Sequence, residues 1–197
     1  MKRVVSIIDC GIGNLLSIKN WLSYVGVVGE VVTEPEGVRN AETLILPGVG
    51  AFCGGMDGLK KHLLIEPIRE IIENGKPFLG ICLGMQMLME CSEEFGRCEG
   101  LGIIPGRVEP IPETKRDGLL HKIPRIGWDS IHTVVSKNKE LNGNLFNSTL
   151  DNKNFYFLHS FMVVPSNDDY RIADTYYNGR RIFAIIGKDN FFGCQFH

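Results

Sequence analysis

The 197-residue chain has a length that suits one domain, and we expect residues 1–197 to form it around a substantial buried core. It is 44% hydrophobic and 22% charged, which is typical of folded globular proteins and argues against disorder. A formal net charge of −2 gives no basic excess of the kind that attracts nucleic acids or anionic membranes, so we expect neither as a partner.

The N-terminus lacks the pattern of an export signal. Its first apolar run is interrupted by Asp9 after a few residues, which is too short for the core of a signal peptide. No segment approaches the roughly 20 apolar residues that span a bilayer. The six cysteines include no Cys-x-x-Cys pair, which argues against zinc and against disulfides in a chain without an export signal. We therefore expect a cytoplasmic protein.

The first half of the chain alternates β-rich segments with segments of helical periodicity. Leu15, Ile18, Leu22 and Val25 recur at the spacing of one helical face, and Gly26 follows as a stop. The predicted strands are 4–9, 27–32, 43–46 and 78–81, and the predicted helices are 15–25, 58–73 and 83–95. Strands joined by helical crossovers predict an α/β fold with a doubly wound, mostly parallel sheet.

After Gly96 the pattern changes to extended segments and turns. Segments 123–135 and 154–164 have the composition of strands. Segments 171–177 and 180–186 flank Asn178-Gly179, a dipeptide that suits a type I′ hairpin turn. A further turn at 188–190 precedes a last strand at 191–196. We therefore expect antiparallel additions to the sheet in the C-terminal half.

The segment most informative about chemistry is 76–86, which reads Lys-Pro-Phe-Leu-Gly-Ile-Cys-Leu-Gly-Met-Gln. An apolar strand runs into Gly80-Ile-Cys82-Leu-Gly84 and a helix begins at once, an arrangement in which hydrolases hold a nucleophile in a strained turn. The helix N-terminus predicts a lowered pKa for the Cys82 thiol, and the Leu83 N–H is placed to stabilise an oxyanion. The alternative is a structural cysteine buried at a strand–helix junction.

A nucleophilic cysteine needs a base, and the chain has five histidines. His159 follows the aromatic run 155–158. His197 ends the last predicted strand, at the edge where the active-site groups of such sheets gather. For each histidine taken alone a structural role is the stronger interpretation, and His197 gains support only from a resemblance.

Two segments, Gly80-Ile-Cys-Leu-Gly-Met-Gln86 and Gly193-Cys-Gln-Phe-His197, together resemble the class I glutamine amidotransferases. Four further segments, in order and at sensible spacing, narrow the resemblance to the glutaminase subunits of imidazole glycerol phosphate synthase. They are 9–14, 46–52, 123–128 and 155–160. The resemblance covers essentially the whole chain.

The resemblance implies that Cys82 attacks the side-chain amide of glutamine while His197 accepts and returns the proton, without a cofactor or metal. It implies that the Val49 and Leu83 amides form the oxyanion hole. Gln86 follows Cys82 by one turn of the predicted helix, so both lie on one face. The substrate-binding residues that it implies are Gly48, Gly50, Gln86, His159, Ser160 and Phe161. For segment 47–50 taken alone, an ordinary strand-ending turn is the simpler interpretation.

Members of this family pair with a (β/α)₈-barrel synthase subunit, which receives the ammonia through a sheltered passage. The resemblance therefore implies a heterodimer that forms imidazole glycerol phosphate in histidine biosynthesis. Asn14 and Trp128 match positions near the interface. The alternatives are a turn or helix cap for Asn14 and a core position for Trp128.

Several features depart from the family pattern. Family members continue Pro-Glu-Lys-Ser after the histidine, and that glutamate orients the base, whereas the sequence given ends at His197. We expect the natural chain to be longer; the alternative is a non-catalytic regulatory subunit. Cys10 replaces an aromatic residue, and Arg125 and Asp129 stand where the family usually has His and Asn. These changes suggest, as a second hypothesis, a paralogous glutaminase that serves a sugar-modifying synthase. A stand-alone cysteine hydrolase is disfavoured by Gln86 and by the interface-like segments.

Overall fold

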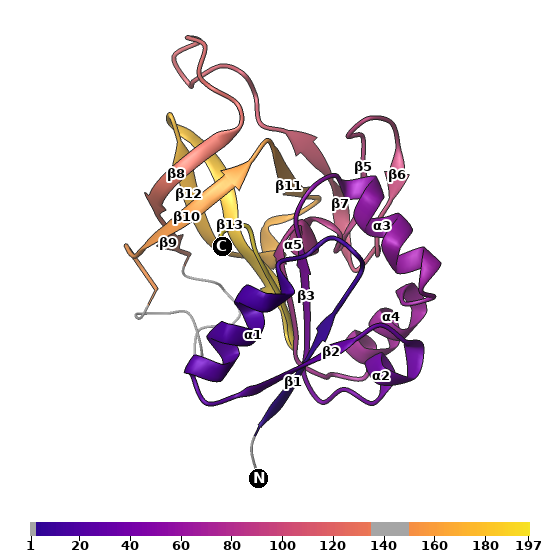
Figure 1. The fold of residues 1–197 in the computed structure, drawn as a ribbon. Helices are drawn as coiled ribbons and strands as arrows, with labels where there is room; N and C mark the ends of the chain where they lie inside the picture. Colours follow the sequence, from indigo (N-terminus) through magenta and orange to yellow (C-terminus); the bar gives the residue numbers. More distant parts are fainter. Residues whose placement is uncertain (1–2, 135–149) are drawn as a thin grey trace.

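The computed structural model describes residues 3–134 and 150–197, and eight strands in this part of the chain form the central sheet. These strands are β1 Val4–Ile8, β2 Val28–Val32, β3 Leu44–Gly48, β4 Phe78–Cys82, β9 His132–Thr133, β12 Arg171–Tyr177, β13 Arg180–Lys188 and β14 Phe191–Cys194. Their order is β2-β1-β3-β4-β14-β13-β12-β9 (Figure 1). The first five are parallel and the rest antiparallel, which confirms the predicted α/β fold.

Helices cover both faces of the parallel half of the sheet. They are α1 Leu15–Tyr24, α2 Pro35–Arg39, α3 Phe52–Lys61 and α4 Ile65–Glu73. Because neighbouring strand residues point to opposite faces, Ile7 and Ile45 pack against Leu22 of α1, whereas Ile8 and Leu46 join the larger core beneath α2, α3 and α4. No helix within the described residues is long and apolar enough to cross a membrane.

The helix predicted at 58–73 is in fact two helices. α3 ends at Lys61, and Leu63 takes the left-handed conformation with φ 58° before α4 begins at Ile65. Leu64, which is fully buried, donates its backbone N–H to the carbonyl of Leu59 and so fixes the bend. The break allows both short helices to bury an apolar face, which one straight helix of this length would not do.

The prediction of a helix at 83–95 is wrong after its first turn. α5 spans only Leu83–Gln86, and β5 follows at Met89–Ser92. Met87, Leu88 and Met89 are all fully buried, and Met89 pairs with Ile104 of a neighbouring strand. A run buried on every side shows no helical or strand periodicity, and pairing with a distant strand decided its conformation.

The second half of the chain also forms two smaller sheets. Their strands are β5, β6 Cys98–Glu99, β7 Ile104–Pro110, β8 Arg125–Ser130, β10 Asn154–His159 and β11 Phe161–Pro165. One sheet has the order β11-β7-β5-β6, and β8 and β10 form a separate antiparallel pair, which we call the β8–β10 ribbon. The predicted segment 154–164 therefore splits between two sheets at Ser160. In the predicted segment 123–135, residue 135 lies outside the described residues.

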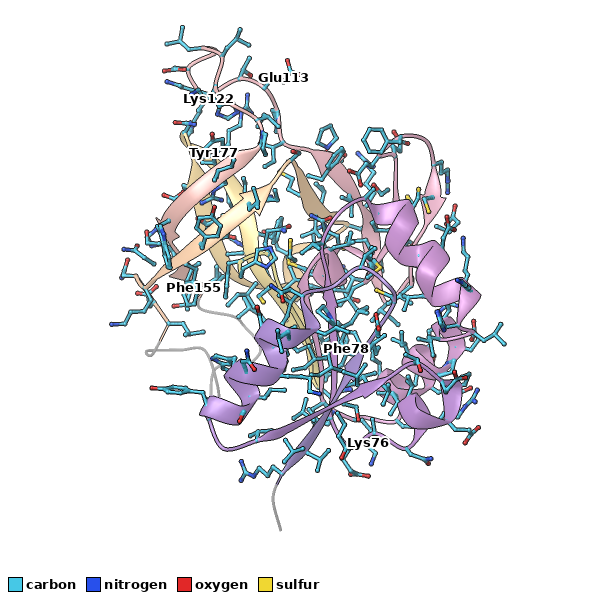
Figure 2. All side chains as sticks on the ribbon, viewed as in Figure 1. Lys76, Phe78, Glu113, Lys122, Phe155 and Tyr177 are labelled. Carbon is cyan, nitrogen blue, oxygen red and sulfur yellow. The ribbon has the colours of Figure 1, made fainter. Side chains whose placement is uncertain are left out.

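The predicted C-terminal hairpin is present as β12 and β13. Asn178 and Gly179 have φ values of 50° and 81°, as a type I′ turn requires. Beside this turn, the Tyr177 hydroxyl donates to the Lys122 carbonyl at 2.7 Å (Figure 2). The chain then turns at Asp189, which has φ 52°, and β14 enters the sheet parallel to β4. This insertion brings the C-terminal residues beside the end of β4.

Candidate active site

Cys82 occupies the predicted sharp turn between a strand and a helix. It ends β4 and precedes α5, with φ 53° and ψ −106°, which is a strained conformation for a residue with a side chain. A Cβ on Gly80 would lie 2.6 Å from the Gly84 carbonyl oxygen, and a Cβ on Gly84 would lie 1.8 Å from the Leu46 carbonyl oxygen. The turn therefore requires glycine on both sides of the cysteine.

The environment of the Cys82 thiol raises its pKa to about 11, so the predicted lowering of this pKa is wrong for the conformation described here. Burial is the main cause, since the residue is only 7% exposed. The Leu83 N–H and the Gln195 side chain, whose Nε2 lies 3.5 Å from Sγ, act in the opposite direction. Because α5 has only four residues, its dipole does not offset desolvation. The sulfur is a neutral thiol at pH 7 and needs a base to react.

His197 lies three residues beyond the end of β14, the strand that pairs with β4. β14 pairs with β4 so that Cys194 stands opposite Ile81, one residue before Cys82. The His197 backbone N–H donates to the Tyr156 carbonyl at 3.0 Å, which ties the end of β14 to the β8–β10 ribbon. Burial lowers the pKa of His197 and favours the neutral imidazole, the form that can accept a proton.

Gln86 lies beside Phe161 at the start of β11, and its side chain forms hydrogen bonds within the protein. Its side chain is buried, and Nε2 donates to the Phe161 carbonyl at 3.2 Å and to Oε1 of Gln195 at 3.1 Å. His159 Nδ1 lies 2.8 Å from the same Phe161 carbonyl. The structure thus brings Gln86, His159 and Phe161 together, with Ser160 in the intervening bend. Gln195 is an addition that sequence reasoning passed over, although it lies within the motif that ends at His197.

The two predicted oxyanion donors differ in their present orientation. The Leu83 N–H bonds to the Cys82 thiol. The Val49 N–H instead donates to the Ile12 carbonyl at 3.2 Å, so in this conformation it is not free to bind an oxyanion. Gly48 stands opposite Cys82 in the β3–β4 pairing, and Gly50 has φ 101°. The segment is therefore beside the thiol, but the Val49 peptide must rotate before it can serve the predicted role.

Comparison with known proteins places this geometry in a family. Residues 6–197 match the family described as glutamine amidotransferase class-I. Imidazole glycerol phosphate synthase subunit HisH 1 of Legionella pneumophila (strain Lens) is 48% identical over 193 residues, which cover 98% of this chain and 90% of that protein. The chain belongs to the HisH branch of the class I glutamine amidotransferases.

A more distant HisH and a solved structure agree with this assignment. The HisH subunit of Caldanaerobacter subterraneus subsp. tengcongensis is 43% identical over 195 residues, 98% of this chain and 89% of that protein. The structure described as PurLQS from Thermotoga maritima superimposes with a TM-score of 0.73 at 19% identity, over 100% of this chain and 88% of that chain. At that identity the structural likeness supports the amidotransferase fold alone.

The two predicted interface residues of this HisH-branch chain are both accessible. Asn14 caps α1, with its Oδ1 accepting the Ser17 N–H at 3.2 Å, so the capping alternative is correct for its side chain. Trp128 is 70% exposed, which rules out the core alternative in the chain as described. Its ring centroid lies 5.7 Å from that of Tyr156, its partner across the β8–β10 ribbon, with the two rings tilted by 60°. The neighbouring pair of Ile126 and Leu158 is also exposed.

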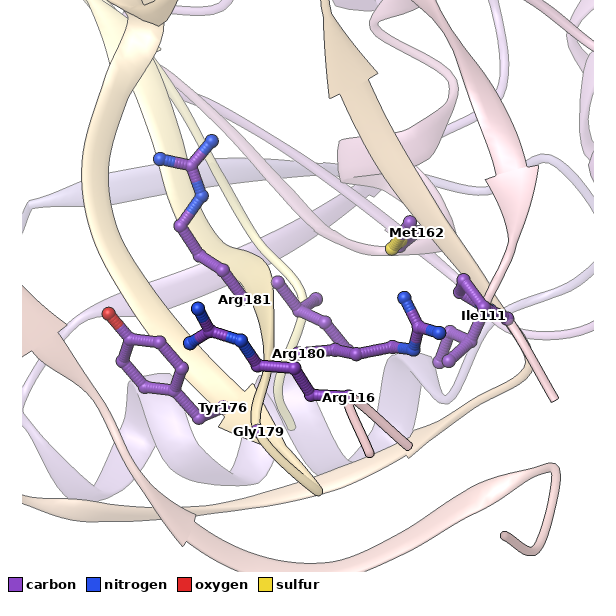
Figure 3. A pocket seen from close by; sticks show the side chains of 9 residues that line it. Ile111, Arg116, Met162, Tyr176, Gly179, Arg180 and Arg181 are labelled. Atoms are coloured by element: carbon purple, nitrogen blue, oxygen red, sulfur yellow. The ribbon is translucent and has the colours of Figure 1, made fainter. Parts of the chain in front are cut away.

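One pocket lies away from these residues. It has a volume of about 340 Å³ and is bounded by the β12–β13 hairpin and the segment after β7 (Figure 3). Arg116, Arg180 and Arg181 line it, together with Tyr176 (Figure 3). Arg180 is held by the Thr114 carbonyl and by Thr114 Oγ1 at 2.8 Å. None of the predicted site residues lines this pocket, so it has no part in the chemistry inferred for Cys82.

His159 should make the stability of the HisH-branch chain depend on pH. Burial is the first cause that lowers its pKa from 6.5 to about 4, and the Arg125 charge adds to the shift. Between these two values the unfolded chain binds a proton that the folded chain does not, so stability is full above about pH 6.5 and falls as the pH drops toward 4. We expect the wild type to lose about 3 kcal/mol more than His159→Gln between pH 7 and pH 4.

Urea unfolding at a series of pH values measures this difference. Glutamine at position 159 retains a donor for the Phe161 carbonyl but has no proton to gain. His62→Gln, on the surface of the chain after α3, is the matched control and should follow the wild type. Equal losses in wild type and His159→Gln would contradict the prediction.

Proposed function

We propose that this chain is the glutaminase subunit of imidazole glycerol phosphate synthase, acting in the cytoplasm as one half of a heterodimer. It hydrolyses glutamine to glutamate and ammonia, and a (β/α)₈-barrel synthase subunit uses the ammonia in histidine biosynthesis. The observation that carries the proposal is the strained Cys82 turn beside β14, the strand that leads to His197, in a chain 48% identical to a HisH subunit.

The proposed chemistry uses these groups in sequence. Neutral His197 removes the proton from the Cys82 thiol, and Sγ attacks the amide carbon of the glutamine side chain. The Leu83 N–H stabilises the oxyanion of the tetrahedral intermediate, joined by the Val49 N–H once its peptide has rotated. The C–N bond then breaks as His197 returns the proton to nitrogen, releasing ammonia and leaving a γ-glutamyl thioester. Water hydrolyses the thioester to glutamate and restores the thiol.

The substrate is held on the side of the thiol formed by α5, β11 and the segment after β3. We assign its binding to Gly48, Gly50, Gln86, His159, Ser160 and Phe161. Gln86 and His159 both contact the Phe161 carbonyl, so this backbone is fixed before a substrate arrives. A preformed site of this kind limits the entropy lost when glutamine binds.

The outer face of the β8–β10 ribbon is the surface that we assign to the synthase. Trp128, Ile126 and Leu158 are exposed apolar side chains on one ribbon, and aromatic residues of this kind carry much of the energy of protein interfaces. Asn14 begins α1 in the loop that also contains Ile12, the acceptor for the Val49 N–H. The loop of Asn14 is therefore connected to the oxyanion segment through Ile12.

The test is reconstitution with the barrel synthase subunit of the same organism. We expect glutamate formation to rise sharply when the partner and its ligand are added, and imidazole glycerol phosphate to form from glutamine. Trp128→Ala should weaken complex formation by at least about tenfold. Tyr24→Ala, which removes an even more exposed aromatic at the opposite end of α1 from Asn14, is the control and should bind normally. A chain that neither binds the synthase nor hydrolyses glutamine in its presence would disprove the proposal.

A second candidate is a paralogous glutaminase that supplies ammonia to a sugar-modifying synthase. The observation that favours it is the ion pair between Arg125 and Asp129 at 2.6 Å, in the ribbon segment where the family usually has His and Asn. Coupling to a sugar-modifying synthase but not to the histidine-pathway barrel, in the same reconstitution, would select this candidate.

A further inference from the structure

The pocket between the β12–β13 hairpin and the segment after β7 is positively charged, although the whole chain carries a formal net charge of −2. Arg116, Arg180 and Arg181 are among its nine lining residues, and none of the nine is acidic (Figure 3). Arg116 and Arg180 form no ion pair with any residue that the structure describes. Arg181 lies 3.8 Å from the Asp168 carboxylate, which also pairs with Arg171. The pocket therefore has an excess of positive charge, which favours an anionic ligand.

The Arg180 guanidinium is fixed by neutral groups. Its Nε donates to the Thr114 carbonyl, and its Nη2 donates to Thr114 Oγ1 at 2.8 Å and to the Lys115 carbonyl at 3.3 Å. These acceptors hold the guanidinium in place, but none of them carries a negative charge that would cancel its own. Because the group is ordered before a ligand arrives, little side-chain entropy is lost when it binds one.

Arg116 crosses the turn of the hairpin. Its backbone N–H donates to the Asn178 carbonyl at 3.2 Å, and a Cβ on Gly179 would lie 3.2 Å from its Cβ and 3.8 Å from its Cδ. The aliphatic part of the side chain therefore lies against the turn, and in Figure 3 the guanidinium points toward Tyr176. This guanidinium donates to no group in the described part of the chain, so its fork of N–H donors is available to a ligand.

The pocket has a cationic end and a more apolar end (Figure 3). At the cationic end, near the Arg116 guanidinium, Tyr176 and Arg181 are partners across the hairpin, and the Tyr176 side chain is partly exposed. At the other end, Ile111 and Met162 lie beside the Arg180 guanidinium (Figure 3). The volume of about 340 Å³ is within the range of small-molecule sites. A ligand that fits both ends has an anionic group joined to an organic body.

We propose that this pocket binds an organic phosphate of the size of a nucleoside monophosphate. Arg116 and Arg181 hold the phosphate, with the Tyr176 hydroxyl as a further donor, and the organic body extends along the apolar lining toward Arg180. A phosphate suits this end because its charge is close to −2 at pH 7 and its oxygens accept paired N–H bonds from guanidinium groups. No bond is made or broken in the pocket. The proposal goes beyond the glutaminase function and does not depend on it.

The experiment is calorimetric titration of the full chain with adenosine monophosphate as the probe, and with inorganic phosphate and adenosine as its two halves. We expect one molecule of the monophosphate to bind per chain, and each half to bind at least about tenfold more weakly, because each contacts only one end of the pocket. Arg116→Met should weaken binding of the monophosphate at least about tenfold, since it removes charge-assisted hydrogen bonds. Arg116→Lys retains the charge but not the paired donors, and we expect an intermediate affinity.

Controls separate binding in the pocket from a general effect of charge or folding. Arg97→Met removes an exposed arginine that pairs with Glu99 outside the pocket, and it should bind the monophosphate as the wild type does. Arg116→Met should unfold at the same urea concentration as the wild type, because the Arg116 side chain is exposed.

Three results would overturn the inference. They are an absence of saturable binding to the wild type, an unchanged affinity in Arg116→Met, and an affinity for inorganic phosphate equal to that for the monophosphate. None of them bears on glutamine hydrolysis, which is measured separately, so the proposed function can stand or fail independently of this site.

Discussion

Replacing Cys82 by alanine is expected to abolish glutamine-dependent turnover and to leave ammonium-dependent synthesis by the complex unchanged. Removing the sulfur removes the atom that attacks the amide, and loss of a nucleophile lowers turnover by about 10⁴-fold or more. Alanine leaves the backbone of the turn in place, so binding of the synthase should persist. Glutamate release and product formation, each measured with glutamine and with ammonium chloride, check both halves of this prediction.

Cys91→Ala is the matched control, because Cys91 lies in β5 and has no part in the proposed site. It should retain wild-type turnover. A glutamine-analogue electrophile provides an independent measurement, since it should modify Cys82 in the assembled wild-type complex. Glutamine-dependent activity in Cys82→Ala would refute the nucleophile, and absence of labelling in the complex would favour the non-catalytic alternative.

Replacing Gly84 by alanine is expected to cause the largest loss of stability among glycine-to-alanine changes at the residues that the structure describes. The new Cβ would lie 1.8 Å from the Leu46 carbonyl oxygen, so the backbones of α5 and β3 must separate. Overpacking against backbone is not relieved by a change of rotamer, and we expect at least about 3 kcal/mol of destabilisation. Chemical denaturation measures it, and glutaminase activity should fall with it because the Cys82 turn moves.

Gly54→Ala provides the control for this substitution. Gly54 is exposed within α3, and a Cβ there would meet no heavy atom within 4 Å. Alanine also has the higher helix propensity, so this variant should gain about 0.5–1 kcal/mol. If Gly84→Ala were as stable as Gly54→Ala, the close approach of α5 to β3 would be incorrect.

The parallel half of the fold and the C-terminal hairpin were predictable because their signals are local. The periodicity around Leu22, the stop at Gly26 and the Asn178-Gly179 turn each correspond to an observed feature. The errors arose where distant contacts decided the conformation. The run after Gln86 was read as helix, but pairing of Met89 with Ile104 makes it a strand. No local pattern distinguishes a fully buried strand from a buried helix.

The site was predictable in its nucleophile but not in its electrostatics. The glycines around Cys82 indicated the sharp turn, and the structure contains it. The thiol pKa was predicted in the wrong direction because sequence shows a helix start but not the degree of burial, and burial dominates here. Likewise, nothing local reveals that the Val49 N–H bonds to Ile12 or that Gln195 reaches the sulfur, since both contacts depend on tertiary packing.

The hydrogen bond from the Val49 N–H to the Ile12 carbonyl bears on how a cell conserves glutamine. While it persists, a developing negative charge would meet only one of its two donors, and lacking one such donor slows turnover by about 10²- to 10³-fold. A subunit produced in excess of its synthase would thus hydrolyse glutamine only slowly. Ile12 shares a loop with Asn14, so in the proposed complex docking at that loop would be able to release the Val49 N–H.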